Sequence, residues 1–504
     1  MKLVKKDIFP YIYLVLISLL ILGIFYSLFL ISVSEITLAL VWLIEGNYKD
    51  KLSKLKKQPY VILWISLYIF LIIGLFYSTD LKYGFNDLRV KLPMLLLPLA
   101  FATITPHDFL YKYFNKFYLF SSLIFVLIPI IAYITGLIAS VKDISWYQNH
   151  IRASLLITIA IAIILFSPET IKFKKNRIVI PILIILFIFF QILIASLAPF
   201  LLSIMIFIIW LIIKIYTKNK YIAITFLLLL LIGLPLGMFF WYQSFFGIPK
   251  QISKNDIKTL EIENKNLFNP YLIDESLVIA WNEVSEKSIN ENNPLADITY
   301  YTAVRFLASK NLPLDYRGIK MLSKEEIKAI EQGIPNYRLF NTIPIITRVY
   351  NLFYEIYRIN KDGQLYFYGS LSQRLIYLQA GISLIKEKPL FGWGTGDVNL
   401  AFTKYYSKNY PEISPKLYRK AHNQFVTIGV ALGLAGMLLL FSLWLYPIFN
   451  TKLRKNISSL WICLWVIFTV MMLIEDMLEG QQATTMTVFF LNFYLLLFKN
   501  PSKI

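Results

Sequence analysis

Long apolar runs separated by short polar segments dominate this chain. We place twelve membrane-spanning helices near residues 10–29, 31–45, 60–78, 91–104, 117–139, 151–167, 178–195, 198–216, 221–241, 423–448, 458–475 and 483–498. A helix needs roughly 20 apolar residues to cross the hydrocarbon core of a bilayer, and its internal hydrogen bonds satisfy the backbone there. The pattern predicts an all-α polytopic membrane protein with about 12 transmembrane helices. The second and fourth runs are short, so these helices could be tilted, re-entrant or partly buried.

The long segment between the ninth and tenth spans has helix signals of its own. Ser323 to Glu326 form a capping box, and Gly333 ends the helix that it starts. Two amphipathic helices follow, marked by Ile345, Val349, Leu352 and Ile356, and then by Leu371, Leu375, Leu378, Ile382 and Ile385. We find no convincing strand pattern and no internal repeat, so this segment is expected to be mainly helical.

Charge sets the orientation of these helices. The 50 Lys and Arg residues exceed the 30 Asp and Glu residues by 20, and many of the cations lie in alternate short loops. These loops are Lys49–Lys57, Lys172–Arg177, Lys214–Lys220 and Lys452–Lys455. Cytoplasmic loops of membrane proteins are rich in Lys and Arg, so the excess reflects topology and not nucleic-acid binding. Both termini are therefore predicted to be cytoplasmic.

This topology divides the chain into three regions. Residues 1–241 form an N-terminal bundle of about nine spans, residues 242–421 form one large loop on the far side of the membrane, and residues 422–504 form about three further spans. Only 16% of residues are charged, against about 25% in soluble domains. The single cysteine, Cys463, allows neither an internal disulfide nor a cysteine metal site.

Several cations lie on the far side of the membrane, against the orientation rule. They are Lys82, Arg89, Lys91, Lys142, Arg152, Arg374, Arg419 and Lys420. Arginine suits phosphate because its planar fork donates two parallel hydrogen bonds. A lipid-linked diphosphate at headgroup level is one ligand for such a group. Ordinary pairing with acids or lipid headgroups is the alternative for each cation.

His422 is one of three histidines and stands just before an apolar helix. Histidine can take a proton near neutral pH, which is needed when a hydroxyl becomes a nucleophile. A helix-entry residue with a local hydrogen bond is the alternative. Glu475, Asp476 and Glu479 end the eleventh span, and they could orient His422 or Arg374, bind a cation, or pair with nearby cations.

The segment Gly392-Trp393-Gly394-Thr395-Gly396-Asp397 is glycine-rich like a phosphate-binding loop. No strand precedes it, so a nucleotide-binding interpretation lacks its structural context. Tight turns and close backbone approach are the favoured reason for three glycines here.

The predicted spans contain few ionisable residues, chiefly Glu35 with Gln191 as a polar companion. Transporters coupled to ions usually place such residues at mid-membrane depth. A flippase or other transporter of lipid-linked sugars is therefore a weaker alternative, and a non-catalytic membrane scaffold is a third.

The order of these motifs resembles the O-antigen ligase and polymerase superfamily of bacterial envelope glycosyltransferases. The matching stretches are Ser372-Gln373-Arg374, residues 384–397, Ala421-His422-Asn423-Gln424-Phe425, Gly433-Leu434-Ala435-Gly436, residues 475–482 (EDMLEGQQ) and Asn149-His150-Ile151-Arg152-Ala153-Ser154. Residues 302–333 look like the Bacteroidota branch of these proteins. The motifs are concentrated in residues 370–485, whereas the topology is similar over the whole chain.

The resemblance implies a metal-independent, inverting glycosyltransferase of the C-type class in the bacterial inner membrane, with no cofactor and its active site on the periplasmic face. The donor would be a glycan on a polyprenyl diphosphate, with membrane lipids around it, and the acceptor a hydroxyl of the lipid A core. A polymerase of repeat units and a protein O-glycan ligase are the alternatives within the superfamily.

The resemblance also assigns residues. Arg374 would hold the diphosphate and His422 would activate the acceptor hydroxyl. Further diphosphate contacts are expected from Arg152, Arg419, Lys420 and Arg89, and supporting roles from Gly392, Gly394, Gly396, Asn423, Glu475 and Glu479. One departure stands out: members often carry a Ser-Arg pair between the seventh and eighth spans, where this chain reads Ala195-Ser196-Leu197-Ala198-Pro199.

Overall fold

The computed structural model describes residues 8–104, 108–138, 149–167, 178–247, 260–269, 274–290, 298–365, 367, 369–454 and 457–497. Of the predicted features, Lys142 and the basic loop Lys172–Arg177 lie outside these residues. The chain packs as two compact units, one made of Met1–Trp210 with Gln373–Ile504 and the other of Leu211–Ser372. The predicted division into three regions at residues 241 and 421 describes the membrane topology of the chain, and it stays a prediction.

All regular elements of the first unit are helices within its described residues. Its elements are α2 (Phe9–Tyr26), α3 (Leu28–Ile44), α4 (Tyr48–Lys56), α5 (Pro59–Leu75), α6 (Leu81–Lys91), α7 (Pro93–Thr103), α8 (Asp108–Ile134), α9 (His150–Phe166), α10 (Val179–Leu193), α11 (Leu197–Tyr216), α18 (Ser370–Glu387), α19 (Val398–Asn409), η5 (Pro415–Leu417), α20 (Gln424–Phe449), α21 (Thr451–Arg454), α22 (Ser459–Ile474), α23 (Gln481–Asn492) and η6 (Phe493–Leu497). Helices α11 and α18 run across the boundary between the units.

A helix lies at each of the twelve predicted spans. Five of the described helices, α2, α8, α11, α12 (Lys220–Phe246) and α20, are long and apolar enough to cross a bilayer, and a sixth span is possible if the bent pair α3–α4 counts as one. Helices α5, α9, α10 and α22 are apolar but shorter. The chain is therefore a polytopic membrane protein, and the count of twelve spans stays a prediction.

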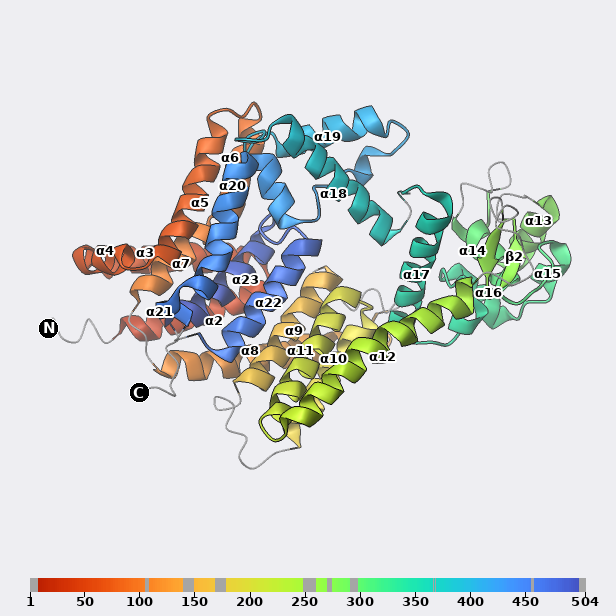
Figure 1. Ribbon diagram of the computed structural model, residues 1–504, viewed down its shortest axis with the longest axis horizontal. Helices are drawn as coiled ribbons and strands as arrows, with labels where there is room; N and C mark the ends of the chain where they lie inside the picture. Colours follow the sequence, from red (N-terminus) through yellow and green to blue (C-terminus); the bar gives the residue numbers. More distant parts are fainter. Residues whose placement is uncertain are drawn as a thin grey trace. The chain divides into compact units, whose positions relative to one another are not determined.

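Helices from both ends of the chain build the interior of the first unit (Figure 1). α5 packs against both α7 and α20, and α23 packs against α7. A cluster of rings joins α7, α8 and the C-terminal helices through Phe101, Phe114, Phe489 and Phe493. The residues around 420 and 475 are thereby fixed to the N-terminal bundle.

Helix α20 is broken at Gly433, where φ is 67° and ψ is −162°. A side chain is strained in this left-handed region, whereas glycine is not. The glycine-rich segment occupies the break. Its backbone donates from Trp393 to the Val430 carbonyl (2.8 Å) and from Gly394 to the Ala431 carbonyl (2.9 Å), and the Pro389 carbonyl accepts from Leu434 (2.7 Å).

The other end of the same segment is bound to the end of α5. Asp397 accepts hydrogen bonds from the backbone amides of Thr79 (2.9 Å) and Asp80 (2.8 Å). The Gly396 amide donates to Ser78 Oγ at 2.9 Å. The segment therefore connects α5 to both halves of α20.

The second unit contains α12, β1 (Glu261–Glu263), β2 (Asn266–Phe268), α13 (Glu275–Val284), α14 (Ile298–Ser309), α15 (Tyr316–Lys320), α16 (Lys324–Glu331), η4 (Tyr337–Leu339) and α17 (Pro344–Asp362). The capping box predicted at Ser323 and Glu326 is present at the start of α16. The antiparallel pair β1–β2 was missed by the sequence analysis. Each strand has only three residues, too few for an alternating pattern.

Two buried acids of β1 organise the polar core of this unit. Glu263 pairs with Arg305 of α14 at 3.1 Å and also accepts from the Tyr350 hydroxyl. Glu261 pairs with Arg358 of α17 at 2.6 Å. Both carboxylates are fully buried, so these ion pairs fix α14 and α17 to the hairpin.

The predicted apolar stripe of α18 is not its buried face. Leu375 and Ile382 are 37% and 42% exposed, whereas Ile376, Ala380 and Leu384 are buried. In a membrane protein an apolar residue can face lipid as readily as protein, so hydrophobic spacing does not identify the packed side.

Candidate functional site

One carboxylate joins Arg374 and His422. Nη2 of Arg374 donates to Oε1 of Glu475 at 2.6 Å, and Nδ1 of His422 lies 3.1 Å from Oε2 of the same residue. Arg374 comes from α18, His422 precedes α20, and Glu475 is the C-cap of α22. The two residues with the strongest sequence case therefore meet, through an acid that was expected to support them.

The backbone of His422 is in the left-handed region, with φ of 48°. Its amide donates to Oδ2 of Asp476 at 3.1 Å, and its ring stacks on Tyr377 with centroids 5.4 Å apart. The next residue, Asn423, caps α20 by accepting from the Val426 amide at 3.1 Å, and its own amide donates to the Leu473 carbonyl. These contacts hold an uncommon conformation and fix the direction of the imidazole.

The contact with Glu475 assigns the proton on the ring. The hydrogen bond from Nη2 of Arg374 at 2.6 Å favours the ionised form of the Glu475 carboxyl. An ionised carboxylate only accepts hydrogen bonds, so Nδ1 must carry the hydrogen. In the neutral ring Nε2 then holds the lone pair, and it has no hydrogen-bond partner among the residues described here.

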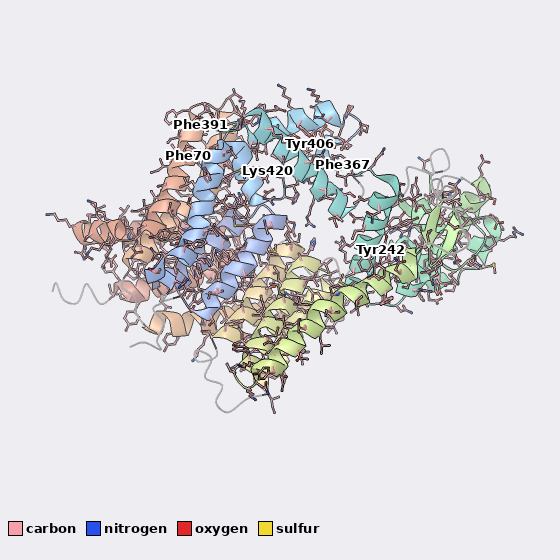
Figure 2. All side chains as sticks on the ribbon, viewed as in Figure 1. Phe70, Tyr242, Phe367, Phe391, Tyr406 and Lys420 are labelled. Carbon is pink, nitrogen blue, oxygen red and sulfur yellow. The ribbon has the colours of Figure 1, made fainter. Side chains whose placement is uncertain are left out.

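A second cluster of charges surrounds Glu479. Lys91 lies 2.8 Å from Glu479 Oε1 and 2.6 Å from Asp87, and Lys420 forms an ion pair with Glu479 Oε2. Burial works to raise the pKa of Glu479, but the charges of Lys420 and Lys91 hold it well below its ordinary value. Two cations thus neutralise two acids. Lys420, labelled in Figure 2, is already paired in this structure.

This cluster also fixes the chain on either side of His422. Lys420 precedes His422 by two residues, and Gln424 follows it by two. The Gln424 side chain donates to Glu479 at 3.2 Å and accepts from the Leu478 amide at 2.6 Å. The loop from Glu475 to Glu479 is therefore bound by a residue before His422 in the chain and by one after it.

Arg152 approaches the same loop from α9. Its guanidinium interacts electrostatically with Glu475 and lies 3.5 Å from Oε1 of Gln482. Arg152, Asn149 and Gln482 line a cavity of about 170 Å³ at the break between α2 and α3. Of the four additional cations, Arg152 is the one with unused donors beside the Arg374–Glu475–His422 cluster.

Arg419 and Arg89 are exposed and bind locally. Arg419 donates to the Tyr418 carbonyl at 3.0 Å, and Arg89 donates to Oδ1 of Asn86 at 2.9 Å. Neither of them contacts Glu475 or His422, so the structure does not gather all five predicted cations around one point.

The three glycines predicted to support the site lie close against the backbone of other elements. A Cβ on Gly392 would lie 2.6 Å from the Ala431 backbone, one on Gly394 2.9 Å from the Gly74 carbonyl, and one on Gly396 2.4 Å from the Asp80 carbonyl. Their backbone amides donate hydrogen bonds to Lys388, Ala431 and Ser78 of the protein, so they do not form an open phosphate-binding loop. They hold the scaffold that carries His422.

Sequence reasoning missed the roles of Asp87, Gly480 and Gln482. Asp87 precedes Lys91 by four residues on α6, a spacing that indicates a helical ion pair. Gly480 lies against Arg152, since a Cβ there would be 2.9 Å from Nη2. At the turn that departs from the family pattern, Ser196 is buried, and its hydroxyl has no partner in the described part of the chain.

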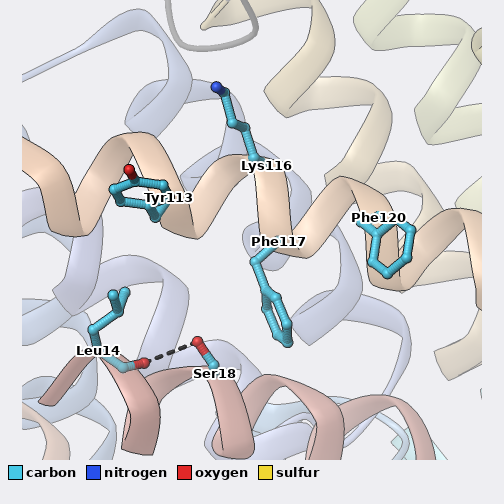
Figure 3. Close-up of a pocket in the computed structure, with 6 residues that line it drawn as sticks. All are labelled: Leu14, Ser18, Tyr113, Lys116, Phe117 and Phe120. Atoms are coloured by element: carbon cyan, nitrogen blue, oxygen red, sulfur yellow. Dashed lines mark hydrogen bonds between the residues drawn. The ribbon is translucent and has the colours of Figure 1, made fainter. Parts of the chain in front are cut away.

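A larger groove of about 380 Å³ lies between α2 and α8. Figure 3 shows Phe117 pointing toward α2 and Lys116 pointing away from it. The groove shares no lining residue with the Arg374–Glu475–His422 cluster. Its size is therefore no evidence for a catalytic site there. Within the described ranges no three His, Cys, Asp or Glu side chains converge as metal ligands would.

The apolar helices define a polytopic membrane protein, and an arginine and a histidine share one carboxylate within it. Residues 339–441 match the family described as O-antigen ligase, which places this segment of the chain in the O-antigen ligase-like superfamily of membrane glycosyltransferase-like enzymes. The match covers about a fifth of the chain and includes Arg374, the glycine-rich segment and His422. No curated protein matches the chain.

Proposed function

We propose that this protein transfers a glycan from a polyprenyl diphosphate to an acceptor hydroxyl, with Arg374 holding the diphosphate and His422 acting as the base. The observation that carries the proposal is the shared Glu475 carboxylate, which binds the Arg374 guanidinium through one oxygen and Nδ1 of His422 through the other. Neither ATP nor a metal ion has a part in this reaction.

Arg374 keeps the capacity to bind an anion although it is paired. A guanidinium carries five N–H donors, and Glu475 engages one of its nitrogens. The Arg374 side chain is 35% exposed, so the remaining donors are open to a ligand. Phosphate oxygens suit this planar fork.

The reaction is one displacement at the anomeric carbon. The acceptor oxygen forms the new bond to that carbon as its proton passes to Nε2 of His422. The bond from carbon to the diphosphate oxygen breaks, and its electron pair leaves with the diphosphate. Attack from the opposite face inverts the configuration.

Two groups lower the barrier in this scheme. Negative charge grows on the leaving diphosphate, where Arg374 stabilises it, and one such donor is worth about 10²–10³ in rate. The base contributes about 10²–10⁴. Glu475 stabilises the imidazolium that forms, as the acid of a catalytic triad does.

Arg152 is proposed as the second diphosphate contact, in place of the arginine missing at Ala195–Pro199. Arg419, Lys420 and Arg89 were expected in the same role. Lys420 is bound to Glu479 and the other two bind locally, so we give them peripheral parts in capturing the anionic donor.

The membrane setting follows from the same proposal. The site opens on the periplasmic face of a bacterial inner membrane, both termini are cytoplasmic, and the lipid A core is the acceptor. Repeat-unit polymerisation and protein O-glycan ligation use the same donor chemistry, and the acceptor that becomes labelled distinguishes the three.

The test is transfer by the full chain reconstituted in vesicles with a polyprenyl-diphosphate glycan and candidate acceptors, without ATP or added metal. Arg374→Ala and His422→Ala should each abolish transfer while the protein still inserts. Lys386→Ala, an exposed cation on the same helix as Arg374, should transfer as the wild type does. Wild-type activity in either of the first two variants would refute the role of that residue.

A further inference from the structure

The groove of about 380 Å³ between α2 and α8 has no part in the proposed reaction. Each helix contributes one face to it, because the lining residues recur at a spacing of three or four. They are Leu14 and Ser18 of α2, and Tyr113, Lys116, Phe117 and Phe120 of α8. The volume falls within the range of about 300–1,000 Å³ that is usual for small-molecule sites. The groove is therefore large enough to be a binding site in its own right.

The two helices pack tightly just beyond the groove. The ring of Phe25 lies against those of Tyr118 and Phe125, with centroids 5.3 Å apart in both pairs. The Tyr26 hydroxyl donates to the Ser121 carbonyl at 3.4 Å. Most of the groove residues precede these contacts along both helices, so the groove opens toward the ends at which α2 and α8 begin.

The position of the groove along α8 sets its depth in the bilayer. The stretch of α8 that is apolar enough to cross a membrane is Tyr113–Ile134, so Lys116 lies in its first turn and Phe120 about 10 Å deeper. Tyrosine is enriched at the membrane–water interface, and lysine lays its stem along apolar surface while its charged head stays in water. The polar rim of the groove therefore lies at headgroup depth, and its aromatic wall at the depth of the acyl chains.

The rim residues Tyr113 and Lys116 both have donors to offer. Neither side chain forms a hydrogen bond or an ion pair with another described residue, and both are exposed. Lys116 points away from α2 (Figure 3), so its ammonium lies at the edge of the groove and not in its floor. The Ser18 hydroxyl donates to the Leu14 carbonyl at 2.8 Å, and no acid is among the lining residues. The rim thus carries a positive charge that the lining leaves without a counterion.

We propose that this groove binds one anionic phospholipid of the surrounding bilayer. The phosphate of the headgroup accepts hydrogen bonds from the Lys116 ammonium and the Tyr113 hydroxyl, and one acyl chain lies along Leu14, Phe117 and Phe120. The inference goes beyond the proposed function, since no residue of the groove takes part in glycan transfer. It assigns a lipid site that fills the space where α2 and α8 diverge.

The order of polar and apolar groups favours such a lipid over other ligands. A soluble anion gains nothing from the apolar wall, and a sugar needs donors and acceptors along its whole length, which this wall lacks. A zwitterionic phospholipid brings an ammonium of its own close to Lys116. The attraction of one lysine to a headgroup of net negative charge corresponds to a preference of about fivefold.

The experiment is native mass spectrometry of the full chain in neutral detergent, titrated with phosphatidylglycerol and phosphatidylcholine that have the same acyl chains. The first phosphatidylglycerol should bind to the wild type about fivefold more tightly than the first phosphatidylcholine. Lys116→Gln should abolish this preference, whereas Lys116→Arg should keep it because the charge remains. An unchanged preference in Lys116→Gln would overturn the proposal.

Lys218→Gln is the control for charge. Lys218 is an exposed lysine between α11 and α12 and does not line the groove, so its replacement should leave the preference for phosphatidylglycerol intact. Equal losses in Lys116→Gln and Lys218→Gln would mean that the preference reflects the positive charge of the whole chain, and the groove would not be its source.

Phe120→Ala tests the apolar wall. Phe120 is 60% exposed, so its removal should leave the packing of α8 intact while both lipids bind about tenfold more weakly, because the acyl chain loses an aromatic contact. Phe189→Ala is the matched control, at an exposed phenylalanine of α10 outside the groove, and should bind both lipids like the wild type. Equal affinities of these two variants would show that no acyl chain lies along Phe120.

A prenyl phosphate is the competing occupant, since it also joins an anion directly to a hydrocarbon. Farnesyl phosphate, added in equal amount, should displace no more phosphatidylglycerol than phosphatidylcholine does. Stronger displacement that disappears in Lys116→Gln would assign the groove to a prenyl lipid and overturn the proposal. The outcome is separate from that of the transfer assay, because the lipid preference is measured without a glycan donor or an acceptor.

Discussion

Nδ1 of His422 lies 3.1 Å from Oε2 of Glu475, and the other oxygen of that carboxylate binds Arg374 at 2.6 Å. The imidazole and the guanidinium are thus positioned by one side chain at the end of α22. Moving either of them disturbs the other, although α18 and the start of α20 are separate elements. Glu475 is therefore the residue whose replacement is most informative.

Glu475→Gln should reduce the turnover number about 10²–10⁴-fold with little change in expression. The amide nitrogen can donate to Nδ1 and favour the tautomer with its hydrogen on Nε2, which removes the base; an acid-to-amide change of this kind costs about 10⁴ in serine proteases. Steady-state transfer in vesicles measures the effect. Glu387→Gln, an exposed acid on α18, is the control and should be neutral. A Glu475→Gln enzyme with normal turnover would show that His422 does not depend on this carboxylate.

Arg374→Lys should lose about 10²–10³ in rate, since lysine keeps the charge but cannot form two parallel hydrogen bonds with a phosphate. Turnover and the Michaelis constant for the lipid-linked donor should be measured together. If only the Michaelis constant rises, Arg374 contributes ground-state binding and not stabilisation of the leaving group.

Glu479 gives the protein an acid-sensitive contribution to stability. Its pKa is lowered from 4.5 to about 2 by Lys420 and Lys91, against the opposing effect of burial. Because the folded-state pKa lies below the unfolded value, this stabilisation is fully present above about pH 4.5 and is lost as pH falls toward 2. Glu479→Gln should lower the unfolding temperature at pH 7 and flatten its decline between pH 4.5 and 2. Thermal unfolding in detergent at several pH values tests this, and parallel wild-type and variant curves would contradict it.

Gly392→Ala should destabilise the protein by about 1–3 kcal/mol or more, because φ is +72° there and the new Cβ would meet the Ala431 backbone at 2.6 Å. Gly237→Ala is the matched control, since no atom lies within 4 Å of its added Cβ and alanine is the better helix former. The midpoint of thermal unfolding compares the two. Equal midpoints would mean that the glycine-rich segment has room for a side chain.

Glu263→Ala should destabilise the second unit by about 3–5 kcal/mol, because it leaves the buried Arg305 without its carboxylate. Limited proteolysis of the full chain should then cut within residues 260–365 at lower protease concentration. Glu283→Ala, which removes an exposed ion pair with Lys320, should have little effect. Similar cleavage of the two variants would argue against a structural role for the Glu263 pair.

The sequence predicts the helices well, because runs of apolar residues and the capping box at Ser323 are local signals. It also singles out Arg374 and His422, which stand where basic residues are uncommon. The pairing of Lys91 with Glu479 joins residues far apart in the chain and depends on the packing of α6 against α23, which has no local signature. The apolar stripe of α18 does not identify its buried side for a different reason: a bilayer rewards apolar residues on either side of a helix.

The break in α20 makes chain length, beside the three glycines, a strict requirement between α18 and α19. Four backbone hydrogen bonds join residues 389–394 to residues 430–435 around Gly433, so inserting or deleting one residue would shift all of them out of register at once. Substitutions at Leu390 or Phe391, which are exposed, leave this register intact. The segment therefore fixes the distance between the two halves of α20. The half that begins beside His422 is positioned by this distance.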